Sequence, residues 1–261
     1  MFKRGKLQNL EDCFRGLKDR PEGSVYFCRI NGYHEKIREF LQMYYEAARK
    51  TGVVIEGKIQ NPDETHLQYY EEIMGREFRM DGGFIEESLR RWLPRMNDYQ
   101  RGQVAASIYD TLDDMRRTGK NDNMLKNAYI KFMCWFYYKF ERIVNRLGEN
   151  AVPKILYEGT ISTYELKILD ILSKAGSDII LLQQEGDQNY RKLDPSGTLS
   201  DVLELPGMTG FPTGFGVKWL RKELEKQWNR ERLCGGGPTL SNCTNAWIEG
   251  KGFTDSLKSS S

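Results

Sequence analysis

The sequence has few of the side chains that bind zinc. Its 261 residues include two histidines and five cysteines, and no two cysteines form a C-x-x-C pair. Structural zinc sites use closely spaced cysteine and histidine ligands, so the sequence predicts no metal site of this kind. The odd number of scattered cysteines also argues against a disulfide framework and predicts a reduced, cytoplasmic protein.

Long apolar runs are missing as well. A helix that crosses a bilayer needs about 20 consecutive apolar residues, whereas the most apolar stretch, residues 129–140, is interrupted by Lys131 and Lys139. The N-terminal residues are charged and lack the apolar core of a secretory signal. We therefore expect neither a transmembrane segment nor a secretion signal.

An excess of charge of one sign is also absent. The 39 lysine and arginine residues nearly balance the 37 aspartate and glutamate residues, which leaves a net charge of +2. Proteins that bind nucleic acid through its phosphates usually carry a basic surface. Nucleic acid is therefore not an expected partner, and the composition is that of an ordinary globular protein.

Two parts of the chain have the pattern of a strand, a helix and a second strand. In the first part, residues 24–62, a strand ends at the turn signal Asn31-Gly32, a helix follows over 34–50, and a second strand begins at Val53. Glycine and asparagine favour such turns because they tolerate left-handed backbone conformations.

The second strand-helix-strand part is residues 151–205. Strands are predicted over 154–159 and 178–183, and Ser162 with Glu165 forms an S-x-x-E capping box at the start of the helix between them. An apolar strand that follows a helix is typical of a parallel sheet covered on both faces. The sequence therefore predicts an α/β fold, a Rossmann-like parallel sheet built from βαβ units.

A mostly helical insertion separates these two units. Helices are predicted over 84–96, 101–119 and 121–148, and Asp122 or Asn123 is the expected N-cap of the third. The whole chain then divides into a charged and loosely attached lead-in (1–23), the first βαβ part (24–62), the insertion or subdomain (63–150), the second βαβ part (151–205) and a Gly/Pro-rich connection with a helix near 217–232 (206–261).

The C-terminal tail resembles the beginning of the first βαβ part. Trp247 corresponds to Phe27, and Leu257 corresponds to Ile37. Coincidence is the alternative for so short a match, but an internal repeat would make this chain the front part of a longer protein.

Ligands of open parallel sheets bind beyond the carboxyl ends of the strands, which places the candidate site in three loops. The candidate ligand-binding residues there are Asn31, Gly32, Tyr157, Glu158, Gly159, Glu185, Gly186 and Asp187. Glu158, Asp187 and His34 are the candidates for proton transfer. The alternative is that the carboxylates are solvated loop residues. No G-x-G-x-x-G or P-loop pattern is present.

A second group of polar residues surrounds the start of the predicted helix 121–148. Amide and ammonium groups on one side of it could bind a phosphate or a nucleobase, and the alternative is a capped amphipathic helix. The residues concerned are Lys120, Asn123, Lys126 and Asn127.

Two long stretches carry a resemblance to a known family. They are GKNDNMLKNAYIKFMCWFYYKFERI and VPKILYEGTISTYELKILDILSKAGSDIILLQQEGDQNYRKLDP. Over residues 24–205 the chain resembles the YceG-like family of bacterial proteins, encoded in tellurite-resistance and general stress operons as a component of a "biosynthetic module". Family members are about twice as long, which again implies an N-terminal portion. The resemblance assigns no catalytic residue and no cofactor.

Two functions therefore remain open at this stage. The first is a module component that binds or processes a nucleotide- or sugar-phosphate-type metabolite. The alternative is a non-catalytic component that docks onto other proteins of the same stress-response operon. Whether the protein is an enzyme stays open between them.

Overall fold

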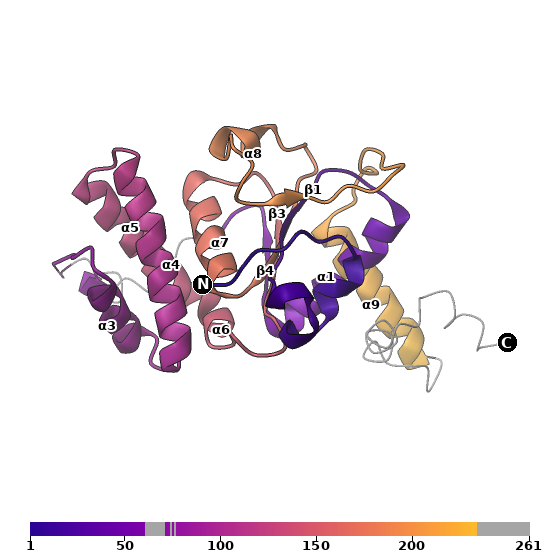
Figure 1. Cartoon of the computed structure of the whole chain (residues 1–261). Helices are drawn as coiled ribbons and strands as arrows, with labels where there is room; N and C mark the ends of the chain where they lie inside the picture. The colour runs from indigo at the N-terminus through magenta and orange to yellow at the C-terminus, as the bar shows by residue number, and fades with distance from the viewer. Residues whose placement is uncertain (61–70, 74, 76, 234–261) are drawn as a thin grey trace.

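The computed structural model describes residues 1–60, 71–73, 75 and 77–233. Within these residues, five parallel strands form one sheet in the order β2-β3-β4-β1-β5 (Figure 1). The strands are β1 (Phe27–Ile30), β2 (Val53–Glu56), β3 (Lys154–Glu158), β4 (Asp178–Leu182) and β5 (Asp201–Val202). The predicted Rossmann-like α/β fold is confirmed, although β5 was not predicted.

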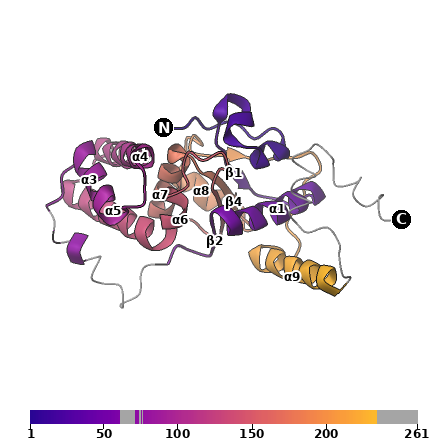
Figure 2. The same ribbon diagram turned by 90° about the horizontal axis from the view of Figure 1, so that it is seen from below.

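Helices cover both faces of the sheet and give a layered structure. Figure 1 shows α1 and α9 on one side of the sheet, and α7 and the insertion helices on the other. The helices are α1 (Glu35–Thr51), α3 (Gly82–Trp92), α4 (Asp98–Arg117), α5 (Asp122–Trp135), α6 (Glu141–Val144), α7 (Thr163–Ala175), α8 (Gln188–Leu193) and α9 (Val217–Leu233). Figure 2 shows the same separation from below.

The alternation of side chains along β4 explains the two apolar cores. Every residue of β4 is buried. Ile179 and Leu181 belong to the core shared with α7 and the insertion, whereas Ile180 and Leu182 belong to the core shared with α1 and α9. Successive strand residues point to opposite faces, so a continuously apolar strand can fill both cores.

The insertion packs on the outer side of α7 and shares one apolar core with it. Its long predicted helix is divided in the structure, because α5 passes through a π-helix at Phe136–Phe140 before α6. The N-cap of α5 is Asn121, whose side chain accepts a hydrogen bond from Met124 N at 3.0 Å. The predicted caps Asp122 and Asn123 were therefore wrong by one and two residues. The division of the chain into separate domains stays a prediction.

The capping box at the start of α7 is confirmed. Ser162 N donates to Glu165 Oε2 at 2.9 Å, and Glu165 N donates to Ser162 Oγ at 3.4 Å. The other carboxylate oxygen of Glu165 accepts from Ile59 N at 2.6 Å. The capping residue Glu165 therefore also holds the segment after β2 in place through its hydrogen bond with Ile59.

The expectation that residues 1–23 are loosely attached was wrong. Val25 N donates to Lys3 O at 3.1 Å, and the Arg20 side chain is fully buried in an ion pair with Asp178 at 2.7 Å. Lys154 Nζ lies 3.1 Å from the same carboxylate. Burial opposes the charge of Asp178, but Lys154 and Arg20 outweigh it and hold the pKa of Asp178 below its usual range. A buried ionic cluster thus anchors the lead-in.

The last described segment contains α8, β5 and α9. The helix predicted near 217–232 is confirmed as α9, whereas the short helix α8 was not predicted. The proposed repeat around Trp247 and Leu257 lies outside the described residues.

Candidate functional site at the carboxyl edge of the sheet

Strands β1 and β4 lie side by side, but the chain leaves them toward opposite faces of the sheet. After β1 it enters α1, whose Ile37 and Phe40 belong to one core. After β4 it enters α8, whose Tyr190 belongs to the other core. Such a topological switch point opens a crevice at the carboxyl ends of the two strands, where open α/β sheets bind ligands.

A polar hollow of about 340 Å³ lies at this edge, and we call it the edge hollow. The loops after β3 and β4 form it, together with α8. Its lining residues are Glu158, Gly159, Thr160, Gln183, Gln184, Glu185, Gly186, Gln188, Asn189 and Lys192. The structure therefore brings together four of the predicted site residues, which are Glu158, Gly159, Glu185 and Gly186.

The other six lining residues were not among the predicted site residues, although Thr160, Gln183 and Gln184 belong to the predicted loops. Most of them are amides that follow β4 in the run QQEGDQN, residues 183–189. A cluster of four side-chain amides directly after a buried strand is a signal that could have found them, because amides both donate and accept hydrogen bonds.

The loop after β1 borders a different hollow. Asn31 and Gly32 line a space of about 530 Å³ together with residues 202–210, and we call it the outer hollow. Tyr33 and Thr209 exchange two backbone hydrogen bonds, at 2.8 and 2.9 Å. The Gly/Pro-rich connection therefore lies against the loop after β1, so the three predicted loops do not line one common hollow.

Glu158 joins the edge hollow to the start of α9. Both of its carboxylate oxygens accept from Val217 N at 3.2 Å, and Gln184 Nε2 donates to Glu158 and to Phe215 O. Gly216 has a backbone φ of +152°, which favours glycine, and an added Cβ would displace the Glu158 carboxylate and the Gln184 amide. Burial raises the pKa of Glu158, and the hydrogen bond from Val217 N only partly offsets this.

The raised pKa of Glu158 leads to a pH-dependent prediction. Folding favours the protonated carboxyl, so its contribution to the free energy of unfolding is complete below the ordinary pKa of 4.5 and is lost as the pH rises through the higher folded pKa. Glu158→Gln removes this loss. Urea unfolding at a series of pH values should show the variant gaining stability relative to the native chain as the pH rises across this window. A difference that stays constant with pH would contradict the prediction.

Asp187 forms structural contacts and is not among the residues that line the edge hollow. Its Oδ2 lies 2.9 Å from Arg29 Nη1 and 3.0 Å from Arg191 Nε. The Arg29 guanidinium also lies 4.1 Å from the centre of the Tyr190 ring. These contacts hold α8 against β1, and a role of Asp187 toward a ligand stays a prediction.

Two other predicted site residues have structural partners. His34 is the N-cap of α1, where its Nδ1 accepts from Lys36 N at 3.1 Å. Tyr157 is buried in the sheet, and its hydroxyl donates to Gly57 O at 3.2 Å. Burial raises the pKa of Tyr157, so this phenol is neutral at physiological pH.

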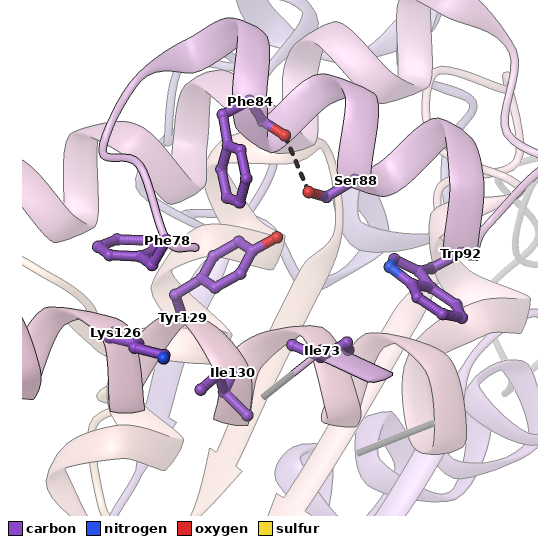
Figure 3. Close-up of a pocket in the computed structure, with 8 residues that line it drawn as sticks. All are labelled: Ile73, Phe78, Phe84, Ser88, Trp92, Lys126, Tyr129 and Ile130. Atoms are coloured by element: carbon purple, nitrogen blue, oxygen red, sulfur yellow. Dashed lines mark hydrogen bonds between the residues drawn. The ribbon is translucent and has the colours of Figure 1, made fainter. Parts of the chain in front are cut away.

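The residues predicted at the start of α5 lie in the insertion. Lys120, Asn123 and Asn127 are exposed, and Lys126 borders a cavity among aromatic side chains (Figure 3). This cavity measures about 10 Å³, which is about the smallest space that holds one water molecule. Phe78 and Tyr129 fill the surrounding space, with ring centres 5.1 Å apart. The cavity is too small for a nucleobase, and phosphate binding by the exposed residues stays a prediction.

Within the described residues, no group of three or more histidine, cysteine, aspartate or glutamate side chains is arranged to hold a metal ion. In the same part of the chain, no helix has the length and apolar character to cross a membrane.

Comparison with known proteins identifies the family. A family model described as "YceG domain" matches residues 10–214, which include the whole sheet and the edge hollow. Comparisons with curated proteins and with solved structures found no match. The family match covers most of the sequence, and the chain therefore belongs to the YceG domain family.

Proposed function

We propose that this YceG-family chain binds a nucleotide- or sugar-phosphate-type metabolite in the edge hollow. One observation carries the proposal: the hollow at the carboxyl edge of the sheet is lined by amides and carboxylates, with a single ammonium group at Lys192. Amide and carboxylate groups form hydrogen bonds with sugar hydroxyls, and lysine pairs with phosphate as a point charge. A volume of about 340 Å³ lies in the range of small-molecule sites.

Ligand binding should stabilise the folded chain. We expect ribose 5-phosphate, glucose 6-phosphate or a nucleoside monophosphate to raise the melting temperature by several degrees at about 100 times its Kd, because a ligand specific for the native state contributes about 2.7 kcal/mol there. Lys192→Gln should weaken the binding of phosphorylated ligands at least about tenfold through the loss of the charge-assisted contact. Isothermal calorimetry measures the affinity of both chains.

Lys222→Gln is the matched control, because Lys222 is an exposed lysine of α9 that does not line the edge hollow. Equal weakening by both substitutions would indicate a general loss of positive charge and would contradict a phosphate contact at Lys192. No thermal shift with any of these ligands would contradict the proposed function itself.

We further propose that the protein is a cytoplasmic component of the bacterial tellurite-resistance and stress-response biosynthetic module. Family membership supports this context. If the edge hollow serves this module, the Lys192→Gln allele should fail to restore tellurite resistance to a strain that lacks the gene. Full restoration would show that tellurite resistance does not depend on the edge hollow.

A second candidate function is docking onto a protein of the same operon. The observation that favours it is that several large apolar side chains of the insertion are exposed. They are Tyr99 (53 %), Tyr109 (37 %), Met124 (45 %) and Tyr137 (39 %). Exposed aromatic side chains are enriched in protein interfaces. Absence of ligand binding, together with co-purification of an operon partner that Tyr109→Ser weakens, would favour this function.

A further inference from the structure

Asn31 and Gln183 lie next to each other at the switch point. Asn31 directly follows β1 and Gln183 directly follows β4, and the last residues of these strands, Ile30 and Leu182, are paired in register. Gln183 N donates to Ile30 O at 3.0 Å. Paired strands lie about 5 Å apart, so the two side-chain amides start from neighbouring points of the sheet edge.

Both amides contain a buried oxygen that accepts no hydrogen bond. The atoms are Asn31 Oδ1 and Gln183 Oε1, and the Gln183 residue is 6 % exposed. An unsatisfied buried acceptor costs about 1–3 kcal/mol, so folded proteins rarely leave one unpaired without a reason. The two unpaired oxygens belong to residues that directly follow the paired strand ends Ile30 and Leu182, and each lacks a donor in the structure.

The location restricts what can supply that donor. Gln183 borders the edge hollow, and Asn31 borders the outer hollow on the far side of the switch point. A group that reaches both must lie across the ends of β1 and β4. A planar group with N–H donors on its edge fits this position, because asparagine and glutamine amides pair with the edges of nucleobases.

We infer that Asn31 and Gln183 recognise the base of a nucleotide, and that this base carries an exocyclic amino group. The inference rests on the proposed function and names its ligand class. The amino group donates to the two orphaned oxygens, while the phosphate of the same nucleotide pairs with Lys192 in the edge hollow. A sugar phosphate without a base would leave both oxygens unpaired.

The first test uses the unmodified chain. Calorimetry compares adenosine with inosine 5′-monophosphate and cytidine with uridine 5′-monophosphate, since each pair replaces an amino group by a keto oxygen. We expect the amino member of at least one pair to bind about tenfold tighter or more, because a site built for a hydrogen-bonding group discriminates against an analogue that lacks it. Ribose 5-phosphate should bind more weakly than that nucleotide.

The second test removes the amides one at a time. Gln183→Leu and Asn31→Ala should each reduce the preference for the amino base over its keto analogue. Gln188→Ala is the control, because Gln188 lines the same hollow but is exposed. Having two separate variants, as well as the test on the unmodified chain, keeps the inference testable if one variant fails to fold.

The outcomes separate the inference from the function on which it rests. Binding of ribose 5-phosphate, with no preference for any amino base, would overturn the inference and leave the proposed function intact; the orphaned oxygens would then bind only water. Failure of every phosphorylated probe to bind would overturn both. A preference for amino bases that both variants keep would also overturn the assignment to Asn31 and Gln183.

Discussion

Replacement of Asp178 by asparagine should lower the free energy of unfolding by about 3–5 kcal/mol, the usual effect of removing one partner from a buried ion pair. Asp178 and Arg20 have fully buried side chains with a closest approach of 2.7 Å, and Lys154 Nζ lies 3.1 Å from the same carboxylate. Asparagine keeps the shape of aspartate but leaves two buried cations without a counter-charge. Equilibrium unfolding in urea measures the difference.

Asp98→Asn is the matched control. Asp98 also pairs with an arginine, Arg101, but its side chain is 87 % exposed, and exposed pairs contribute about 1 kcal/mol or less. The pH dependence provides a second check. Because the pKa of Asp178 is lowered in the folded state, its stabilisation is present above the ordinary value of 3.8 and is lost as the pH falls through the folded pKa. A loss of under about 1 kcal/mol in Asp178→Asn would show that the cluster does not hold the fold together.

Replacement of Gly52 by alanine should cost about 3 kcal/mol or more, because the new methyl group would overlap the backbone of another strand. Gly52 ends α1 immediately before β2, and a Cβ at this position would lie 1.8 Å from Lys154 O and 2.8 Å from Lys154 N. Backbone atoms within a paired strand cannot move aside as a flexible side chain can. The substitution should therefore separate β2 from β3, and urea unfolding together with the yield of folded protein measures the effect.

Gly102→Ala is the control for the loss of a glycine. Gly102 lies inside α4, and a Cβ there would meet no other atom within 4 Å. Alanine favours the helix over glycine by about 0.5–1 kcal/mol, so this variant should be slightly more stable than the native chain. Similar destabilisation by the two substitutions would contradict a specific close approach at Gly52.

Four of the ten residues that line the edge hollow were predicted from the sequence. The loops after β3 and β4 were expected to hold Glu158 and Glu185, and the edge hollow contains both. The pairing of Tyr33 with Thr209 could not be predicted, because it depends on where the Gly/Pro-rich connection crosses the sheet edge. The contact of Glu158 with α9 could not be predicted either, since these elements are separated by 59 residues along the chain.

The sequence by itself determined the elements whose signals are local. A capping box joins residues three apart, a helix repeats every 3.6 residues, and a buried strand is a short apolar run, so α7 and β4 could be recognised without knowing their neighbours. Only the tertiary structure decided the order of the strands, the anchoring of Arg20 to Asp178, and the pairing of Ile30 with Leu182. Most of these features depend on contacts between residues more than a hundred positions apart, and such contacts form only when the hydrophobic layers pack and fix the strand register.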